Sequence, residues 1–518
     1  MALLLPTIGW RVAALLLLIP ADALARAGGG GGFHGSGSHG GGGGGFHGGG
    51  GGGGSGGGGD NGLILWLIIQ LVSHPVVGIP ILLIAVLLYL YWQKQARSGG
   101  PGAGFGPSPY GGDADAMIPN AAAWVVSLRR NDPAFDENAF YARVRVAFDK
   151  IQQAWCGQNL TAVRPFVSDG VHERFLLQIA EQRDEGYHDF MEGIRVLDLR
   201  MAEIESDGIY DEIAVRIRAM SVDYRMSIAT GQRLSGSSQP EEFIEIWTFV
   251  RRQGAQTKAG PGLIEGNCPN CGAAIEMNQS AECAHCKALL RSGQYDWVLT
   301  EITQQSEWNG VRHRQIPGVD DLRRRDPDFN AAGTEDRASV AFWRFATAER
   351  LGKADPLRKV ASPAFLKTLD PYLHPPAGQP RQFRGDDAVG SVRLLGILPA
   401  GAYDRAAVEV TWNGTPFVAG PDGPPRRIGE AALYYSHLVF CRRADTKTEV
   451  GKGISSAHCP TCGAPESGGV SNACDFCGTV LTDGAHGWVL DAFLSRADPQ
   501  AQSLLAELHH RTPVGVPS

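Results

Sequence analysis

The chain has 518 residues, enough for roughly three or four ordinary domains. Its formal net charge of −7 and its isoelectric point near 6.1 argue against a general nucleic-acid binder. Most of its ten cysteines fall in Cys-x-x-Cys pairs, which indicate metal binding in a reducing compartment rather than disulfides. We interpret the other two, Cys156 and Cys441, as small buried apolar side chains.

The N-terminal residues have the pattern of a targeting signal. Arg11 precedes an apolar stretch, and small residues around Ala25 offer a cleavage site, so we expect a signal peptide at residues 1–27. Residues 28–61 are almost pure glycine with a few histidines, and such a tract cannot bury a core. We expect it to be disordered, and its scattered histidines are a poor cage for a metal ion.

A long apolar segment follows the glycine tract. We expect one transmembrane helix at residues 62–93, because this stretch carries no formal charge and is long enough to span a bilayer. Lys94 and Arg97 come directly after it, so the positive-inside rule predicts that the rest of the chain is cytoplasmic. Residues 94–127 form a flexible linker rich in glycine and proline.

The next segment, residues 128–260, begins with helical periodicity. Apolar residues recur at three- and four-residue steps between Asn138 and Gly157, which predicts an amphipathic helix there. Two further helices are expected over residues 160–167 and 168–183. The side chains expected to face inward from the last of them are Phe175, Leu176, Leu177 and Ile179.

Alternating apolar and charged residues follow these helices and predict strands. The expected strands lie near residues 196–201, 213–218 and 242–251. Helices followed by an antiparallel meander indicate an α+β domain. Residues 322–452 show the same order, with helices expected over 335–352 and 364–369 and strands near Val392, Ala406 and Leu433.

Two cysteine clusters share one internal spacing. Each Cys-x-x-Cys pair puts two sulfurs on one tight turn, and two such turns close a tetrahedron around a metal ion. Four thiolates leave no open position for a catalytic water, so we expect two structural zinc ions. Gly272 and Gly463 follow the first turn of each cluster and should have a positive φ. The predicted ligands are Cys268, Cys271, Cys283 and Cys286 in the first cluster and Cys459, Cys462, Cys474 and Cys477 in the second.

The duplication extends well beyond the cysteines. The clusters begin 191 residues apart (459 − 268 = 191), and Trp297-Val298-Leu299 recurs at the same offset as Trp488-Val489-Leu490. Leu128-Arg129-Arg130 recurs at an offset of 194, so small loop changes separate two copies of one unit. We expect a tandem pair of domains, each followed by a zinc ribbon: domain 128–260, ribbon 261–304, linker 305–321, domain 322–452, ribbon 453–495 and a tail at 496–518.

Part of this sequence resembles a known family. The segments that carry the resemblance are Asp132-Pro133, Ile151-Gln152-Gln153-Ala154-Trp155, Val163-Arg164-Pro165-Phe166 and Trp247-Thr248-Phe249. They look like the Tim-44-like family, named for the motor-tethering subunit of the mitochondrial inner-membrane translocase. The resemblance covers about residues 132–252 and is weak over residues 326–443. It implies helices packed on a curved antiparallel sheet, similar to nuclear transport factor 2, with an apolar cavity.

The resemblance also implies a function. Members of the family are membrane-associated tethers, and bacterial ones combine a signal sequence, a glycine-rich tract, one span, the domain and a zinc ribbon. We therefore expect a non-catalytic tether on the cytoplasmic face of a bacterial inner membrane. It would hold a protein partner or a lipid in protein translocation or membrane biogenesis, with translocase and ribosome components as candidate partners.

Two alternatives stay open. The cone-shaped fold also hosts enzymes, and the acid–base candidates, by residue type only, are Asp149, His188, Asp211 and Asp223. Basic residues near the ribbons offer contact with nucleic acid or the ribosome, although scattered charges in an acidic chain usually form a solvated face. They are Arg251, Arg252, Lys258, Lys287, Arg291, Arg442, Arg443 and Lys452. His285 and His458 adjoin ligand cysteines, and we interpret both as bystanders.

Overall fold

The computed structural model describes residues 121–511, except for 276–281, 306–307, 309–315, 377, 421–424, 450–453, 455 and 467. These residues belong to one compact unit. The predicted signal peptide, glycine tract and transmembrane helix, and the linker up to residue 120, lie outside the described residues. Among the helices that are described, none has the length and apolar character that a membrane span requires.

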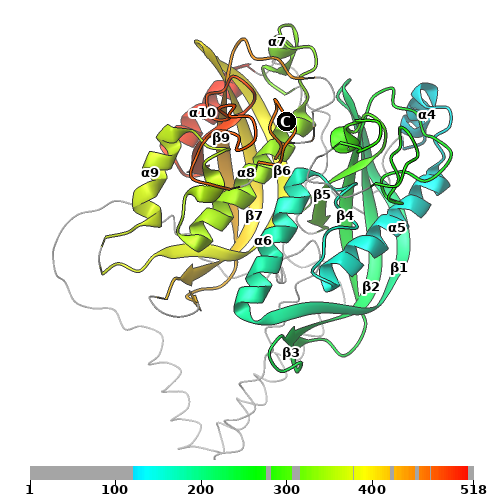
Figure 1. Cartoon of the computed structure of the whole chain (residues 1–518), viewed down its shortest axis with the longest axis horizontal. Coiled ribbons are helices and arrows are strands. Elements are labelled where there is room, and N and C mark those ends of the chain that lie inside the picture. Colours follow the sequence, from blue (N-terminus) through cyan, green and yellow to red (C-terminus); the bar gives the residue numbers. More distant parts are fainter. Residues whose placement is uncertain are drawn as a thin grey trace, which may run out of the picture. The chain divides into compact units, whose positions relative to one another are not determined.

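The first repeat, residues 121–305, folds as three helices beside one antiparallel sheet (Figure 1). Its helices are α4 (Ala121–Asn131), α5 (Glu137–Cys156) and α6 (Asp169–Glu185), and the 3-10 turn η1 (Leu290–Ser292) comes later. The strands are β1 (Tyr187–Ser206), β2 (Tyr210–Ser227), β3 (Arg233–Gly236), β4 (Glu241–Arg252) and β5 (Val298–Gln304). They pair in the order β1-β2-β4-β5, and β3 pairs with β2.

The second repeat, residues 316–511, has the same order of elements (Figure 1). Its helices are α7 (Val319–Arg323), α8 (Ala331–Leu351), α9 (Pro363–Leu373) and α10 (Pro499–Arg511), with η2 at Asp355–Leu357. Its strands are β6 (Gln382–Ala400), β7 (Tyr403–Val418), β8 (Arg426–Arg427), β9 (Ala432–Arg443) and β10 (Val489–Ser495), in the order β10-β9-β7-β6 with β8 on β7. Two antiparallel sheets with flanking helices confirm the predicted α+β class.

A buried ion pair marks the duplication in three dimensions. Arg251 Nη1 lies 2.9 Å from Asp132 Oδ2, and Arg442 Nη1 lies 2.9 Å from Asp326 Oδ2. All four side chains are buried. The carboxylates are 194 residues apart and the arginines 191, which are the offsets of the sequence repeat. The same interaction therefore fixes the start of each repeat to the end of its fourth strand.

Each cysteine cluster is an insertion between two paired strands. In the first repeat, β4 ends before the cluster and β5 begins after it, yet Thr248 pairs with Glu301 across the two strands. In the second repeat, β10 returns in the same way to pair with β9. The boundary predicted at residue 260 therefore lies within one continuous sheet, and each cluster is held at both ends by that sheet.

Three local predictions were wrong. Residues 161–166 form turns rather than a helix; Pro165 has no N–H to donate, and Val167 then forms a bridge with Leu299. Leu176 is 47% exposed on α6 instead of facing inward. Helix α8 begins at Ala331, four residues before the predicted start, because the side chain of Asn330 caps it by accepting the N–H of Gly333 at 2.7 Å.

Large aromatic side chains pack between the helices and the sheet of the first repeat. Phe148 from α5 and Trp247 from β4 have ring centroids 5.4 Å apart, and Phe175 from α6 packs 5.9 Å from Trp155. These residues belong to one buried core, together with Phe166. Burial of each aromatic ring stabilises the repeat by roughly 1.5–3 kcal/mol. The core of the first repeat is thus packed with aromatic side chains from α5, α6 and β4.

The two repeats share this core at their junction. Ile454, from the segment that leads into the second cluster, is buried in the core of the first repeat. Leu177 of α6 is buried in the core of the second repeat. Helices α6 and α8 pack against each other and approach closely at Gly170, where an added Cβ would lie 2.6 Å from the Cβ of Ser339. Only glycine fits at this crossing.

We expect Gly170→Ala to lower the free energy of unfolding by about 1–3 kcal/mol, because the new methyl group overpacks the helix crossing. Chemical denaturation of the full chain measures this change. A double-mutant cycle with Ser339→Gly is the control, since removing the opposing side chain restores part of the room for the methyl group. Asp336 Oδ1, 2.9 Å from the added Cβ, stays in place. A coupling energy of zero between the two positions would contradict this account of the crossing.

Candidate metal centres

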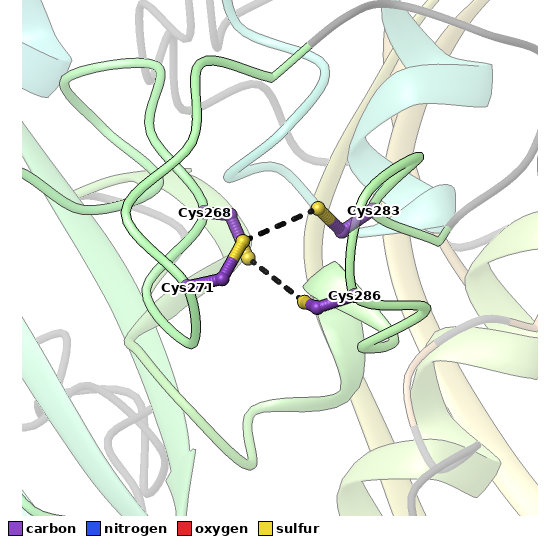
Figure 2. Close-up of side chains that lie close together, drawn as sticks. All are labelled: Cys268, Cys271, Cys283 and Cys286. Atoms are coloured by element: carbon purple, nitrogen blue, oxygen red, sulfur yellow. Dashed lines mark hydrogen bonds between the residues drawn. The ribbon is translucent and has the colours of Figure 1, made fainter.

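The first cluster brings four sulfurs together from two turns (Figure 2). The ligand atoms of Cys268, Cys271, Cys283 and Cys286 all lie within 4.8 Å of one another. Cys268 Sγ is 3.7 Å from Cys286 Sγ, and Cys271 Sγ is 3.8 Å from Cys283 Sγ. The edge of a tetrahedron with metal–sulfur bonds of about 2.3 Å has nearly this length, so the four thiols can hold a metal ion.

The second cluster has the same geometry. The sulfurs of Cys459, Cys462, Cys474 and Cys477 also lie within 4.8 Å of one another. Cys459 Sγ is 3.6 Å from Cys477 Sγ, and Cys462 Sγ is 3.7 Å from Cys474 Sγ. The structure thus brings together all eight cysteines that the spacing singled out, in two groups of four. Among the described residues, only these two groups place three or more potential ligand atoms so close together.

Backbone hydrogen bonds close each turn around its cysteines. In all four turns, the first cysteine accepts an N–H from the residue four positions later. That residue has a positive φ: 79° at Gly272, 71° at Gly463 and 75° at Gly478, but 61° at Lys287. The predicted conformation of Gly272 and Gly463 is therefore confirmed, and Lys287 is the one turn residue that takes it with a side chain.

We expect Lys287→Gly to stabilise the first cluster by up to about 1 kcal/mol, because the left-handed conformation is strained for a residue with a Cβ. Thermal unfolding of the metal-loaded chain measures the gain. Lys287→Ala is the matched control, since it removes the ammonium but keeps the Cβ and should give no gain. Equal effects of the two changes would show that charge, and not backbone strain, decides stability at this position.

The pKa values of the thiols differ within each cluster. Burial raises the pKa of Cys268 and of Cys459 to about 12 in the absence of a metal ion. In contrast, the backbone N–H of Ala288 lowers the pKa of Cys286 to about 6. A divalent cation would draw the buried sulfurs into the thiolate form. These donors fit a soft or borderline metal ion.

Comparison with known proteins identifies the first repeat. Residues 121–261 match the model of the Tim44-like domain family. This part of the chain is a Tim44-like domain. A solved structure described as an "Ntf2 like protein involved in plasmid conjugation" is also similar, at 8% identity and a TM-score of 0.13, covering 67% of this chain and 98% of that chain. A TM-score this low carries no argument. No curated protein matches the chain.

The second cluster docks on the Tim44-like domain through a buried carboxylate. Asp169, at the start of α6, is fully buried and lies 2.9 Å from His458 Nδ1. It also accepts the N–H of Ala457 at 2.8 Å, forms an ion pair with Arg164 and lies 3.6 Å from Arg291. His458 is thus engaged by an aspartate of the first repeat rather than by the metal site beside it. No sequence signal links these residues, because Asp169 and His458 are 289 positions apart.

Two arginines and a histidine determine the charge of this carboxylate. Burial alone would raise the pKa of Asp169, but Arg164, His458 and Arg291 hold it well below its usual range. At His172, one turn along α6, the charged form is disfavoured. Burial and Arg164 lower the pKa of this imidazole to about 3. At neutral pH, Asp169 is therefore ionised and His172 is neutral.

The arginines near the clusters form ion pairs with carboxylates of the same chain. Arg251 and Arg442 are buried in the two repeated ion pairs described above, and Arg291 is buried against Asp169. Arg252 pairs with Asp328 and Arg443 with Asp483, each at 2.9 Å. Lys452 lies outside the described residues. These contacts speak against a nucleic-acid surface built from the arginines beside the clusters.

The four acid–base candidates do not form one site. Asp149 is exposed on α5, and His188 lies on β1. Asp211 and Asp223 are twelve residues apart on β2 (223 − 211 = 12), which corresponds to roughly 40 Å of extended strand. The sequence did not single out Asp189, whose pKa burial raises to about 7. Its carboxylate is bonded to Arg225 at 3.2 Å and to Gln182 at 3.1 Å, a structural arrangement.

Proposed function

We propose that this protein is a non-catalytic, membrane-anchored tether that holds a protein partner through its Tim44-like domain. The observation that carries the proposal is the family match over residues 121–261, because such a domain points to a binding or tethering role. Two further features support it. Aromatic side chains pack in the core of the domain, and the four acid–base candidates are spread over α5, β1 and β2. The second repeat, with its matching element order, would be a diverged Tim44-like domain.

The proposed metal is zinc, with one ion in each four-cysteine cluster and a structural role. Two Cys-x-x-Cys turns with sulfurs 3.6–3.8 Å apart support a tetrahedral ion. Each ion would cross-link a loop between two paired strands. The two repeats would then form one rigid soluble part of the protein. Connected to the membrane by a flexible linker, this soluble part would raise the effective concentration of a bound partner at the membrane.

The proposed anchor is the apolar segment at residues 62–93, in a bacterial inner membrane with both repeats on the cytoplasmic side. We expect a reporter that works only in the cytoplasm to be active when it is fused after Arg97. A reporter that works only after export should be inactive at the same position. The full chain should remain in the membrane pellet after carbonate extraction. An exported reporter, or release of the chain by carbonate, would overturn the anchored topology.

The proposed tethering role is tested by chemical crosslinking in intact membranes, followed by purification of the full chain in mild detergent. We expect a protein, such as a translocase or ribosome component, to co-purify in a defined ratio. The comparison is a chain with residues 121–518 deleted, which keeps the proposed anchor but lacks both repeats. Recovery of the same proteins with both chains would show that the repeats do not hold the partner.

A further inference from the structure

The second repeat holds the first through one basic face. Arg323 of α7 lies 2.7 Å from Asp207, and Arg344 of α8 lies 2.8 Å from Glu173 on α6. Arg393 of β6 lies 3.0 Å from Glu301 on β5. Three arginines from α7, α8 and β6 thus form ion pairs with three carboxylates of the first repeat. Charge complementarity of this kind fixes the register of an interface.

The repeat offsets place basic residues at the same three positions of the first repeat. Arg129 corresponds to Arg323, and Lys150 to Arg344 (offset 194), while Arg200 corresponds to Arg393 (offset 193). Local hydrogen bonds confirm the first equivalence: the Nε of Arg129 donates to the carbonyl of Phe135 at 3.2 Å, as that of Arg323 does to Phe329 at 3.0 Å. The first repeat therefore carries a partial copy of the basic face, because Lys150 Nζ instead donates to the carbonyl of Ile264 at 2.6 Å.

This copy, which we call the α4–α5–β1 face, is exposed. Helices α4 and α5 both pack against β1 (Figure 1). Arg145 Nη1 lies 3.4 Å from the carbonyl of Val196. Three large apolar side chains are exposed between the arginines, at 50%, 40% and 37%. The residues that define the face are Val126, Arg129, Arg145, Val146, Leu197 and Arg200.

The face also carries a positive charge at one position where the basic face of the second repeat has none. Arg145 takes the place of Ser339, the residue that faces Gly170 at the crossing of α6 and α8. Arg200 pairs with its neighbour Asp198 at 2.7 Å, but its side chain is 64% exposed, so this surface pair is weak and a partner's carboxylate can replace it. An acidic surface is the complement of this face.

The second repeat of another copy of this chain cannot supply that acidic surface in the way that the first repeat supplies it to the second repeat. The carboxylates that the second repeat grips are absent from the matching positions of α9, β6 and β10. Glu173 corresponds to Lys367, Glu301 to Ala492 and Asp207 to Ala400. Gly170 corresponds to Ala364, whose methyl group would block the close helix crossing. The occupant must therefore be another molecule.

We propose that the α4–α5–β1 face binds an acidic helical segment of another protein, in the way that the basic face of the second repeat holds α6. Interspersed arginines and exposed aliphatic side chains are typical of protein-binding surfaces. The internal contact, in which a helix presents Glu173 to a basic helix, is the template. This inference names the site for the proposed tethering role, but it does not depend on the membrane anchor.

The test uses the full chain in detergent and a labelled synthetic peptide with the sequence of residues 169–185, the helix that the second repeat grips. We expect saturable binding by fluorescence anisotropy and a photocrosslink from benzoylphenylalanine placed at Val146. The charge reversal Arg129→Glu with Arg145→Glu should weaken binding at least tenfold. The matched control, Arg426→Glu with Arg427→Glu on exposed β8, should change it less than twofold.

Each other outcome overturns the proposal. A peptide that fails to bind, or that binds the charge-reversed chain equally well, shows that the face does not recognise an acidic helix. Crosslinking to anionic phospholipid in proteoliposomes, without binding of the peptide, makes the face a membrane contact. Because neither readout involves fractionation or co-purified proteins, the inference can fail while the proposed tether stands, and the tether can fail while the face binds its peptide.

Discussion

Cys268→Ser should remove one of two bound metal ions and unfold the first repeat, whereas Cys459→Ser should remove one ion and have a smaller effect on the fold. Cys268 and Cys283 belong to the main core of the first repeat, together with its aromatic residues. Cys459 and Cys474 form only a small separate cluster with Leu481. The first metal ion therefore supports a much larger core than the second.

The magnitude follows from the free energy of structural zinc. Binding of zinc to ribbon-like sites contributes roughly 10–16 kcal/mol of folding free energy. A typical domain is stable by only about 5–15 kcal/mol, so loss of the first ion leaves the repeat without a stable fold. Elemental analysis should give two zinc ions for the natural chain and one for each variant. Circular dichroism and tryptophan fluorescence report the loss of structure.

The control is Cys441→Ser, a half-buried cysteine of β9 outside both clusters, which should keep both metal ions. A chelator should reproduce the effect of the two ligand substitutions together, whereas a reductant should have none. Unfolding by reductant instead of chelator would mean that the cysteines form disulfides. Equal loss of structure in Cys268→Ser and Cys459→Ser would contradict the difference between the two cores.

The metal centres were visible in the sequence because their geometry is local. Two cysteines three residues apart lie on one turn in any fold, and the turn itself selects glycine at its fifth position, as at Gly272 and Gly463. The helices and central strands were also predictable, because apolar residues recur along the whole of α5 and β4 with the spacing of a helix and of a strand. Local periodicity identified the elements of both repeats.

Long-range pairing was not visible. The strands β5 and β10 return to their sheets across the cysteine clusters, and a seven-residue strand shows no partner in its own pattern. Leu176 fits the apolar period of α6, but α6 packs on two cores at once, which leaves this position exposed. Tertiary contacts, rather than periodicity, decide such positions. The contacts at the junction between the repeats are also tertiary, so the local sequence pattern does not predict them.

Asp169→Ala should destabilise the junction by about 3–5 kcal/mol, the usual effect of removing one partner from a buried charge network. Arg291 would stay buried without its carboxylate, and the N–H of Ala457 would lose its acceptor. We expect faster hydrogen exchange at the start of α6 and around Ala457, with the metal content unchanged. Chemical denaturation gives the size of the effect.

Two variants separate the charge of Asp169 from its hydrogen bonds. Asp169→Asn keeps an acceptor for Ala457 but removes the charge that Arg291 requires, so its destabilisation should lie between those of the natural chain and of Asp169→Ala. Glu430→Ala breaks the exposed pair with Arg427 and should change stability by less than about 1 kcal/mol. If Asp169→Ala were as mild as Glu430→Ala, the second cluster would not be held by this carboxylate. The packing of Ile454 and the crossing of α6 with α8 would then carry the junction alone.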